Sequence, residues 1–410
     1  MNVIFLTLVR ISDIEERGIY SDLMRKFRDE GHQLYIVSPC ERRLGVNTQL
    51  TENYGVRILN VKTLNIQKTN IVEKGLGTLL IERQYINAIQ KYLGNIKFDL
   101  ITYSTPPITF TNVAKYLKKR NPQAVTYLQL KDIFPQNAVD IGMFGGKSVF
   151  YWFFRKKEKA LYEVSDYIGC MSPANVKFVT DHNPEVAPDK VEVAPNSVEL
   201  RRTENADNTE SELQKDNEQF FIRKKYGLPT DKPVLIYGGN LGVPQGIDYL
   251  VKCLDANKNR TDCFFVVVGS GTHYHMIADW YERNHNKNVK LMASLPKADY
   301  DILVRSCDVG LIFLDHRFTI PNYPSRLLSY LENKMPVLCA TDMNTDIGKI
   351  AEENGYGYWC ESVKPEDFTA IVDKMLQSDM KVMGEKGYEF LKQNYTVENT
   401  YKAIMSHVNI

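Results

Sequence analysis

The sequence lacks the features that mark membrane-spanning, secreted or polyanion-binding chains. No apolar run approaches the ~20 residues that a transmembrane helix needs. Met1 leads directly into NVIFLTL, without a basic region or a small-residue cleavage site, so we expect no signal peptide. The formal net charge is only +1, which gives no global field for nucleic acid, and any basic partner site must be local.

Cysteine is present, but its spacing does not suit a disulfide framework or structural zinc. The seven cysteines are odd in number, contain no CxxC pair, and fall mostly in or beside apolar runs. Free cysteine in such places behaves as a small hydrophobic residue. We therefore expect a reduced, cytoplasmic protein without structural zinc or a disulfide framework.

What the chain does contain is a repeated alternation of short apolar runs and amphipathic helices. With 410 residues, 43% of them hydrophobic and 25% charged, it fits two domains of about 180–200 residues each. The alternation predicts an α/β fold with parallel sheets covered on both faces. Strands are expected at 3–8, 34–38, 56–61, 100–103, 125–130, 167–171, 191–194, 234–237, 264–268, 289–291, 309–313 and 337–340.

A charged segment divides the two halves. Residues 199–219 contain RRTENADNTESELQKDNEQ, which is almost without apolar side chains and cannot form core. We expect a mobile connection there that proteases cut first. The predicted domains are 1–198, 220–390 and a C-terminal helix, 391–410, that packs back toward the first domain.

Two glycine turns follow strands of the second half. VLIYGGNLGVPQG places Gly238, Gly239 and Asn240 at a strand end and Gln245 near a helix start. VVVGSG places Gly269-Ser270-Gly271 after another strand, although the third glycine of a dinucleotide fingerprint is missing. Glycine lets a backbone approach a ligand closely. An ordinary strand-to-helix turn explains each motif equally well.

The segment IPNYPSRLLSYLENKMPVLCA predicts a loop, a short helix and a buried strand. Pro324-Ser325-Arg326 would place a hydroxyl, backbone amides and a guanidinium at the helix N-terminus, which suits an anion. The alternative is a simple N-cap at Ser325 with a solvated Arg326.

The first half offers three loops at predicted strand ends, which should meet at one edge of its sheet. They contain Gly18, Thr105 and Asp132. Asp132 is a candidate general base or hydroxyl acceptor. An Asx-type turn before Pro135 is an equally good explanation of that aspartate.

Taken together, the motifs resemble a known enzyme family over nearly the whole chain. The segments are GGNLGVPQGIDYL, VVVGSGTHYHMI, NYPSRLLSYLENKMPVLCATD and LQLKDIFPQNAVDIGMF. They resemble glycosyltransferase family 4, in the branch of bacterial O-antigen and capsule enzymes related to N-acetyl-fucosaminyl transferases. The resemblance implies a GT-B fold, in which two Rossmann-like domains face each other across a cleft and C-terminal helices return to the first domain.

This sequence departs from the family pattern at charged positions. Pro321 and Ser329 stand where the family usually has its two glutamates. Asn240 and Gln245 stand nearest the usual cationic pair that binds the donor diphosphate. Arg326 is therefore the best remaining cation for the phosphates.

The resemblance implies transfer of a hexosyl or N-acetylhexosaminyl group from a nucleotide sugar to a hydroxyl of a glycan or polyprenyl-linked acceptor. It also implies retention at the anomeric carbon, with no metal and no bound cofactor. Asp132 and Arg326 would be catalytic, and Gly18 and Thr105 would bind acceptor. The implied donor-binding residues are Gly238, Gly239, Asn240, Gln245, Gly269, Ser270, Gly271, Ser294, Leu295, Pro324, Ser325 and Ser329. A nucleotide-sugar 2-epimerase and a non-catalytic sugar-nucleotide-binding protein remain as alternatives.

Residues 149–159, VFYWFFRKKEK, predict a helix with aromatic side chains around its first turns and basic ones after them. Six bulky residues in a row cannot all face inward at 3.6 residues per turn. We expect some to be exposed and to contact an anionic membrane surface peripherally. Burial under the last C-terminal helix is the alternative.

Overall fold

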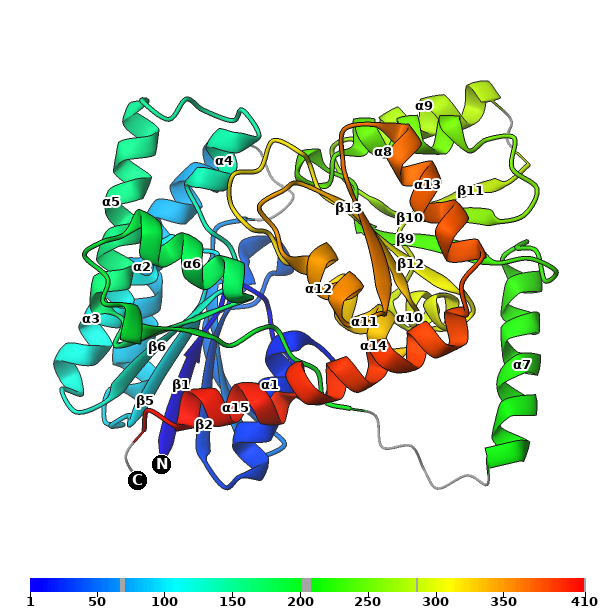
Figure 1. Ribbon diagram of the computed structural model, residues 1–410. Helices are drawn as coiled ribbons and strands as arrows, with labels where there is room; N and C mark the ends of the chain where they lie inside the picture. Colours follow the sequence, from blue (N-terminus) through cyan, green and yellow to red (C-terminus); the bar gives the residue numbers. More distant parts are fainter. Residues whose placement is uncertain (67–70, 201–207, 285–286, 409–410) are drawn as a thin grey trace. The chain divides into compact units, whose positions relative to one another are not determined.

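The computed structural model describes residues 1–66, 71–200, 208–284 and 287–408 (Figure 1). It divides into two compact units. The first unit contains residues 1–199 and 395–410, and the second contains residues 200–394. The C-terminal return to the first unit begins at Tyr395, later than the expected 391. Each unit has its own parallel sheet, which confirms the α/β class.

The sheet of the first unit has the order β3-β4-β2-β1-β5-β6-β7-β8. All neighbouring pairs are parallel except β3 with β4. The strands are β1 (Asn2–Leu6), β2 (Gln33–Glu41), β3 (Gln49–Asn53), β4 (Val56–Thr63), β5 (Leu100–Ser104), β6 (Val125–Leu130), β7 (Tyr167–Cys170) and β8 (Val191–Val193).

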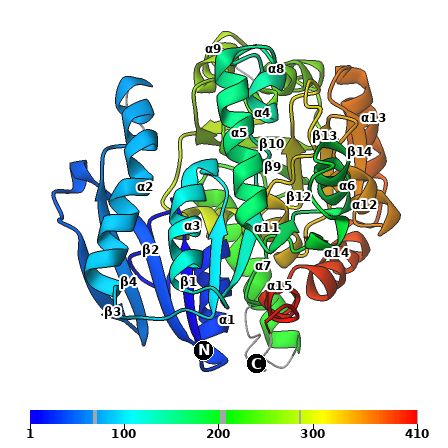
Figure 2. The ribbon, with the colours of Figure 1, turned by 90° about the vertical axis from the view of Figure 1, so that its left-hand side faces the viewer.

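Helices cover both faces of this sheet. They are α1 (Ile19–Asp29), α2 (Ile71–Leu93), α3 (Thr111–Arg120), α4 (Gln136–Asp140), α5 (Val149–Val164), α6 (Pro173–His182) and α15 (Val397–Met405). On one face α1 and α15 share a core with the strands, where the rings of Phe27 and Tyr401 lie 4.9 Å apart. On the other face α3 lies between α2 and α5 (Figure 2).

The sheet of the second unit has the order β11-β10-β9-β12-β13-β14 and is parallel throughout. The strands are β9 (Val234–Asn240), β10 (Phe264–Ser270), β11 (Val289–Met292), β12 (Val309–Phe313), β13 (Val337–Thr341) and β14 (Gly357–Glu361). Apolar strands such as VVVGS and VGLIF are buried because helices cover both sheet faces.

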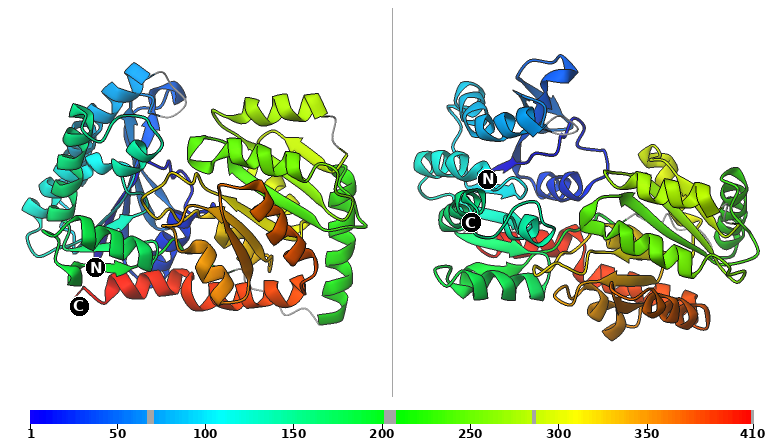
Figure 3. Two further views of the ribbon diagram at one scale, coloured as in Figure 1. Left: turned by 45° about the horizontal axis from the view of Figure 1, so that its top comes forward. Right: turned by 90° about the horizontal axis from the view of Figure 1, so that it is seen from above.

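The helices of the second unit are α7 (Asn208–Lys225), α8 (Ile247–Ala256), α9 (Tyr274–Asn284), α10 (Lys297–Arg305), α11 (Arg326–Glu332), α12 (Ile347–Glu353), α13 (Pro365–Leu376) and α14 (Met380–Asn394). Helices α8, α9 and α13 pack together on one face of the sheet, whereas α11 and α12 contact β12 and β13 from the other (Figure 3).

The structure corrects the sequence prediction at several elements. Strands β3 and β14 and helices α4, α12 and α13 were not expected, and the second part of the segment predicted as a polar connection is helical from Asn208. Residues 201–207 lie outside the described residues. The segment from Asn208 lacks glycine and proline and is rich in Glu, Gln and Lys, which are good helix formers. Low apolar content excludes core, but it does not exclude a helix.

Each sheet has one topological switch point, where the strand order reverses. It falls between β1 and β5 in the first unit and between β9 and β12 in the second. Ligands of doubly wound sheets bind at the carboxyl ends of strands near such points. The predicted site residues follow β1, β5 and β6 in one unit, and in the other they lie at or after the carboxyl ends of β9, β10, β11 and β12.

Candidate functional site

In the second unit the glycine turns are built by close pairing of β9 with β10. Gly239 pairs with Gly269, and Asn240 pairs with Ser270. A methyl group at Gly269 would lie 1.9 Å from the carbonyl oxygen of Gly239, so a side chain cannot fit there without separating the strands. Gly239 itself has φ +128°, a conformation that favours glycine. The two turns therefore lie together at one edge of the sheet.

We expect Gly269→Ala to destabilise the second unit by about 2–3 kcal/mol, because the added methyl meets backbone rather than a flexible side chain. Urea unfolding measures the change. Gly145→Ala is the matched control, since nothing lies within 4 Å of its added methyl, and it should change stability by less than about 0.5 kcal/mol. An equal effect of both substitutions would contradict the steric explanation.

Arg326 lies against the β9 turn. Its guanidinium carbon is 4.4 Å from the centre of the Tyr237 ring, and its Nη2 would be 3.4 Å from a methyl group at Gly239. Its Nη1 is buried without a hydrogen-bond partner among the described residues. A buried guanidinium nitrogen without a partner is costly, so an anion placed beside it would stabilise this arrangement.

Tyrosine hydroxyls, rather than carboxylates, surround this guanidinium. Tyr237 donates to the Asn240 carbonyl at 2.8 Å, and Tyr330 donates to the Ile236 carbonyl at 3.2 Å. Burial raises the pKa of Tyr300 to about 12 and also raises the pKa of Tyr237, although Arg326 opposes both shifts. The hydroxyls therefore stay neutral near pH 7 and do not cancel the charge of Arg326.

The N-terminus of the short helix α11 is not capped in the expected way. Ser325 occupies the N-cap position, but its exposed side chain makes no capping hydrogen bond within the described chain. The alternative in which Ser325 only caps the helix and Arg326 is solvated is therefore wrong. Pro324 precedes Ser325 and is half-buried, and the Ser329 carbonyl accepts the Asn333 amide at 2.7 Å.

The loop before α11 is braced from the loop after β13. Asp342 is fully buried, and its Oδ1 accepts the backbone N–H groups of Asn344 and Thr345, each at 2.8 Å. Asn344 donates from Nδ2 to the Phe318 carbonyl at 2.6 Å, and Thr345 donates to the Asn322 carbonyl at 2.5 Å. These bonds fix the path of the chain that leads to Arg326.

The other predicted donor residues lie at the same sheet edge with differing surroundings. Asn240 donates from Nδ2 to Oε1 of Gln245 at 2.7 Å, so these two neutral side chains pair with each other. Gly271 packs on the backbone of Leu241. Ser294 is exposed and Leu295 half-buried in the connection from β11 to α10.

In the first unit the structure concentrates polar groups around Asp132, just after β6. Oδ1 of Asp132 accepts a hydrogen bond from Nδ2 of Asn137 at 2.7 Å. Burial raises the pKa of Asp132 to about 6, although the bond from Asn137 opposes the shift. The pKa of Tyr20 is raised by burial and further by the charge of Asp132, which places that tyrosine nearby. A carboxyl group with this pKa can take a proton near neutral pH.

Thr105 supports Asp132 instead of offering a free hydroxyl. It is fully buried, and its Oγ1 accepts the backbone N–H groups of Lys131 at 2.9 Å and Asp132 at 3.2 Å. The expectation that Thr105 contacts an acceptor is therefore wrong. Lys131 extends toward β8, where Nζ donates to the Ala194 carbonyl at 3.2 Å, and burial lowers its pKa to about 7.

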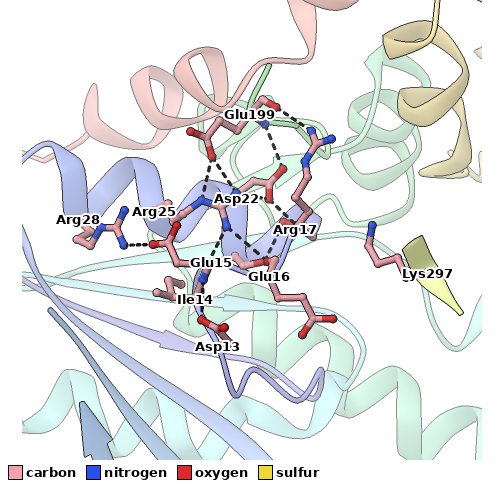
Figure 4. A network of polar contacts seen from close by, with 12 residues as sticks. Asp13, Ile14, Glu15, Glu16, Arg17, Asp22, Arg25, Arg28, Glu199 and Lys297 are labelled. Atoms are coloured by element: carbon pink, nitrogen blue, oxygen red, sulfur yellow. Dashed lines mark hydrogen bonds and ion pairs between the residues drawn. The ribbon is translucent and has the colours of Figure 1, made fainter. Parts of the chain in front are cut away.

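Gly18 is the N-cap residue of α1. The helix carries Asp22 and Arg25, which form a polar network with Glu199 (Figure 4). The N–H of Gly18 donates to Oδ1 of Asp22 at 2.9 Å, and the same oxygen accepts from Nη2 of Arg25 at 2.7 Å. Arg25 also pairs with Glu199 at 2.8 Å and donates to the Ile14 carbonyl at 2.6 Å. The amide of Gly18 is thus already bonded, and the network fixes the loop between β1 and α1.

The sequence did not reveal the residues that surround Arg326 in the second unit and Asp132 in the first. Tyr237, Tyr300 and Asn137 contact or adjoin the predicted groups, but aromatic residues in apolar segments are typical of core. Across the described residues no group of three or more His, Cys, Asp or Glu side chains is placed to hold a metal ion. No helix in the described part of the chain is long and apolar enough to cross a membrane.

Comparisons with known proteins show which family and which relatives this chain resembles. Residues 218–390 match the family model of glycosyl transferases group 1. The "Probable glycosyltransferase WbjE" of Pseudomonas aeruginosa is 21% identical over 269 residues, which cover 66% of this chain and 64% of that protein. WcaI of Escherichia coli K12, named provisionally as a glycosyl transferase of colanic acid biosynthesis, is 22% identical over 160 residues, or 38% of each chain. The matches thus span less than two thirds of these relatives.

The fold is shared with solved structures over almost the whole chain. HepE of Anabaena, solved in complex with UDP and glucose, superposes with a TM-score of 0.70 at 13% identity and covers 99% of this chain and 98% of that one. The predicted GT-B fold is confirmed, and so is the resemblance to this class of glycosyltransferases. The N-acetyl-fucosaminyl branch stays a prediction.

Proposed function

We propose that this chain, whose residues 218–390 match the glycosyl transferases group 1 model, transfers a sugar from a nucleoside-diphosphate sugar to a hydroxyl of a glycan or polyprenyl-linked acceptor. The observation that carries the proposal is Arg326, which has a buried, unpartnered Nη1 beside the β9 glycine turn. The relatives named as glycosyltransferases and the UDP-bound neighbour support it.

The donor diphosphate would bind at Arg326 and the amides of Gly238, Gly239 and Asn240. As the bond between the anomeric carbon and the diphosphate oxygen breaks, negative charge grows on the leaving diphosphate. Fixed donors in a water-poor site stabilise that charge without reorganising. No resident metal enters this arrangement. The second unit thus supplies leaving-group stabilisation.

The acceptor hydroxyl would bind at Asp132 in the first unit. Its oxygen forms the new bond to the anomeric carbon, and its proton passes to the Asp132 carboxylate or to the departing diphosphate. Asn137 orients the carboxylate for this role, and the buried Thr105 holds the backbone N–H of Asp132. We propose retention at the anomeric carbon, as the family resemblance implies, with a hexosyl or N-acetylhexosaminyl group transferred. In one step this requires the hydroxyl oxygen to attack from the same face that the diphosphate leaves.

The biological setting that we propose is bacterial surface polysaccharide assembly, such as O-antigen or capsule, on the inner face of the cell membrane. The name of WcaI supports a polysaccharide role for the similar region of this chain. All seven cysteines are free and buried, which suits a reducing compartment. The resemblance to transferases of lipid-linked acceptors supports the membrane location.

The test is turnover with a panel of nucleotide sugars and a polyprenyl-linked acceptor. We expect a glycosylated lipid and one equivalent of nucleoside diphosphate, with the donor configuration retained in the product by NMR. Conversion of the donor sugar without acceptor would indicate a 2-epimerase instead. Tight donor binding with neither reaction would indicate a binding protein.

A further inference from the structure

Four large apolar side chains are exposed at the start of α5. Val149 is 84% exposed, Phe150 67%, Trp152 64% and Phe153 43%. We call these four residues the aromatic face. Val149, Trp152 and Phe153 follow the i, i+3, i+4 spacing of one helix stripe. Ser148 caps this helix end by accepting the N–H of Tyr151 at 3.1 Å, so the residues belong to a formed helix.

The opposite stripe of α5 forms its contact with the first unit. Glu158, Leu161 and Tyr162 are buried there, and the Phe154 ring packs at 4.9 Å and 76° on that of Phe134. The aromatic face is therefore not the core side of the helix. Burial of these aromatics under the last helix, the alternative left open by the sequence, is wrong because α15 packs on α1.

The basic residues that follow are mostly paired, which corrects the expectation of a free basic cluster. Arg155 pairs with Glu158 at 2.6 Å, Lys157 with Glu82 at 3.5 Å and Lys159 with Glu185 at 2.9 Å. Lys147 and Lys156 are exposed, and neither forms an ion pair within the residues that the structure describes. One unpaired lysine thus lies before the aromatic face and one after it.

We propose that the aromatic face inserts into an anionic lipid surface, with Lys147 and Lys156 at the headgroups. From Val149 to Phe153 the helix rises about 6 Å, and the apolar stripe then stops at Lys156. A helix that lies in the membrane interface buries its apolar face ~5–10 Å into the boundary between headgroups and acyl chains. Trp152 supplies the aromatic group that favours the membrane interface.

Two contacts link α5 to helix α2 and to the loop that contains Asp132. Leu79 and Leu80 of α2 are 65% and 42% exposed, one turn before Glu82, which pairs with Lys157. The Phe134 ring that packs on α5 belongs to the loop that begins with Asp132. A lipid-linked hydroxyl at this surface would thus be presented next to the carboxylate.

Sedimentation with vesicles of phosphatidylglycerol and phosphatidylcholine in equal parts tests the proposal. We expect the wild-type chain to bind and Trp152→Ser with Phe153→Ser to reduce binding about ten-fold or more. Phe221→Ser is the matched control, because Phe221 of α7 is also 67% exposed but lies far along the sequence in the second unit, and it should change nothing. Lys147→Glu with Lys156→Glu should weaken binding at low salt and remove its salt dependence.

Insertion itself is measured by quenching of Trp152 fluorescence with brominated lipid, which Trp152→Phe should abolish. The membrane docking rests on the proposed transfer to a lipid-linked acceptor. Because vesicle binding needs neither donor nor acceptor, failure of the membrane proposal is distinguishable from failure of the proposed sugar transfer. Absence of vesicle binding, equal binding by the Trp152/Phe153 variant, or dimerisation that the same variant abolishes would each overturn the proposal.

Discussion

Asp132→Asn should lower the turnover of sugar transfer by about 10²–10⁴-fold, the usual contribution of a positioned general base, while nucleoside diphosphate binding stays unchanged. The reason is that Asp132 lies in the first unit, whereas the proposed donor-binding groups lie in the second. Single-turnover kinetics and calorimetry with the same preparation measure the two effects separately. A turnover within a few-fold of wild type would remove Asp132 from the reaction.

The pH profile gives an independent check on this carboxylate. Burial raises the pKa of Asp132 to about 6, and a base must be ionised to accept a proton. Activity should therefore fall with decreasing pH below about 6 and level off above it. Asn137→Ala removes the hydrogen bond that favours the ionised form, so the acid limb should move to higher pH. An unmoved limb would assign it to another group.

Stability separates a catalytic effect from unfolding. The folded pKa of Asp132 lies above the value of 3.8 expected when it is solvated, so its ionisation disfavours the folded state as pH rises through about 6. Asp132→Asn removes that penalty and should be at least as stable as wild type at pH 7. The stability difference should vanish below about pH 4, where both side chains are neutral. Thermal melts over this pH range measure it.

The fold was largely predictable because burial on both sheet faces leaves a clear sequence pattern. Strands such as Val125–Leu130 and Val309–Phe313 are continuous apolar runs, and their bounds agree with the expected ones. Strand β3, with the sequence QLTEN, is an antiparallel edge strand with exposed side chains and therefore has no such run. Hydrophobic patterns in a sequence indicate which elements are buried, so exposed elements such as β3 are not predicted from them.

The sequence predicted where the candidate site residues lie in the fold, but not which side chains surround them. Turn residues placed Asp132 and Arg326 at sheet edges, because parallel strands all end at the same edge. The contacts that decide their chemistry come from distant parts of the chain. Tyr300 packs on Gly238 from α10, and the loop to Arg326 is held by Asn344. Neither contact follows a sequence spacing, and the burial of Thr105 likewise required the fold.

Arg326→Ala should weaken nucleoside diphosphate binding by about 1.5–3 kcal/mol, or about 10- to 150-fold in the dissociation constant. The guanidinium has a buried Nη1 without a partner among the residues that the structure describes, and it is held over the Tyr237 ring at 4.4 Å. Because the surrounding tyrosines stay neutral, the positive charge remains available to a phosphate. Calorimetry with whichever of UDP, GDP and ADP binds the wild type most tightly measures the loss.

Two further variants test whether the affinity depends on the planar, bidentate guanidinium of Arg326 or only on its positive charge. Arg326→Lys keeps the charge but loses the planar contact with Tyr237 and bidentate bonding, so its affinity should fall between wild type and Arg326→Ala. Arg305→Ala removes an exposed cation at the C-terminal end of α10 and is the control, which should leave the affinity for nucleoside diphosphate unchanged. Since Asn240 and Gln245 pair with each other as neutral groups, they add no second cation to compensate for Arg326. Equal affinities of wild type and Arg326→Ala would therefore place the diphosphate elsewhere on the second unit.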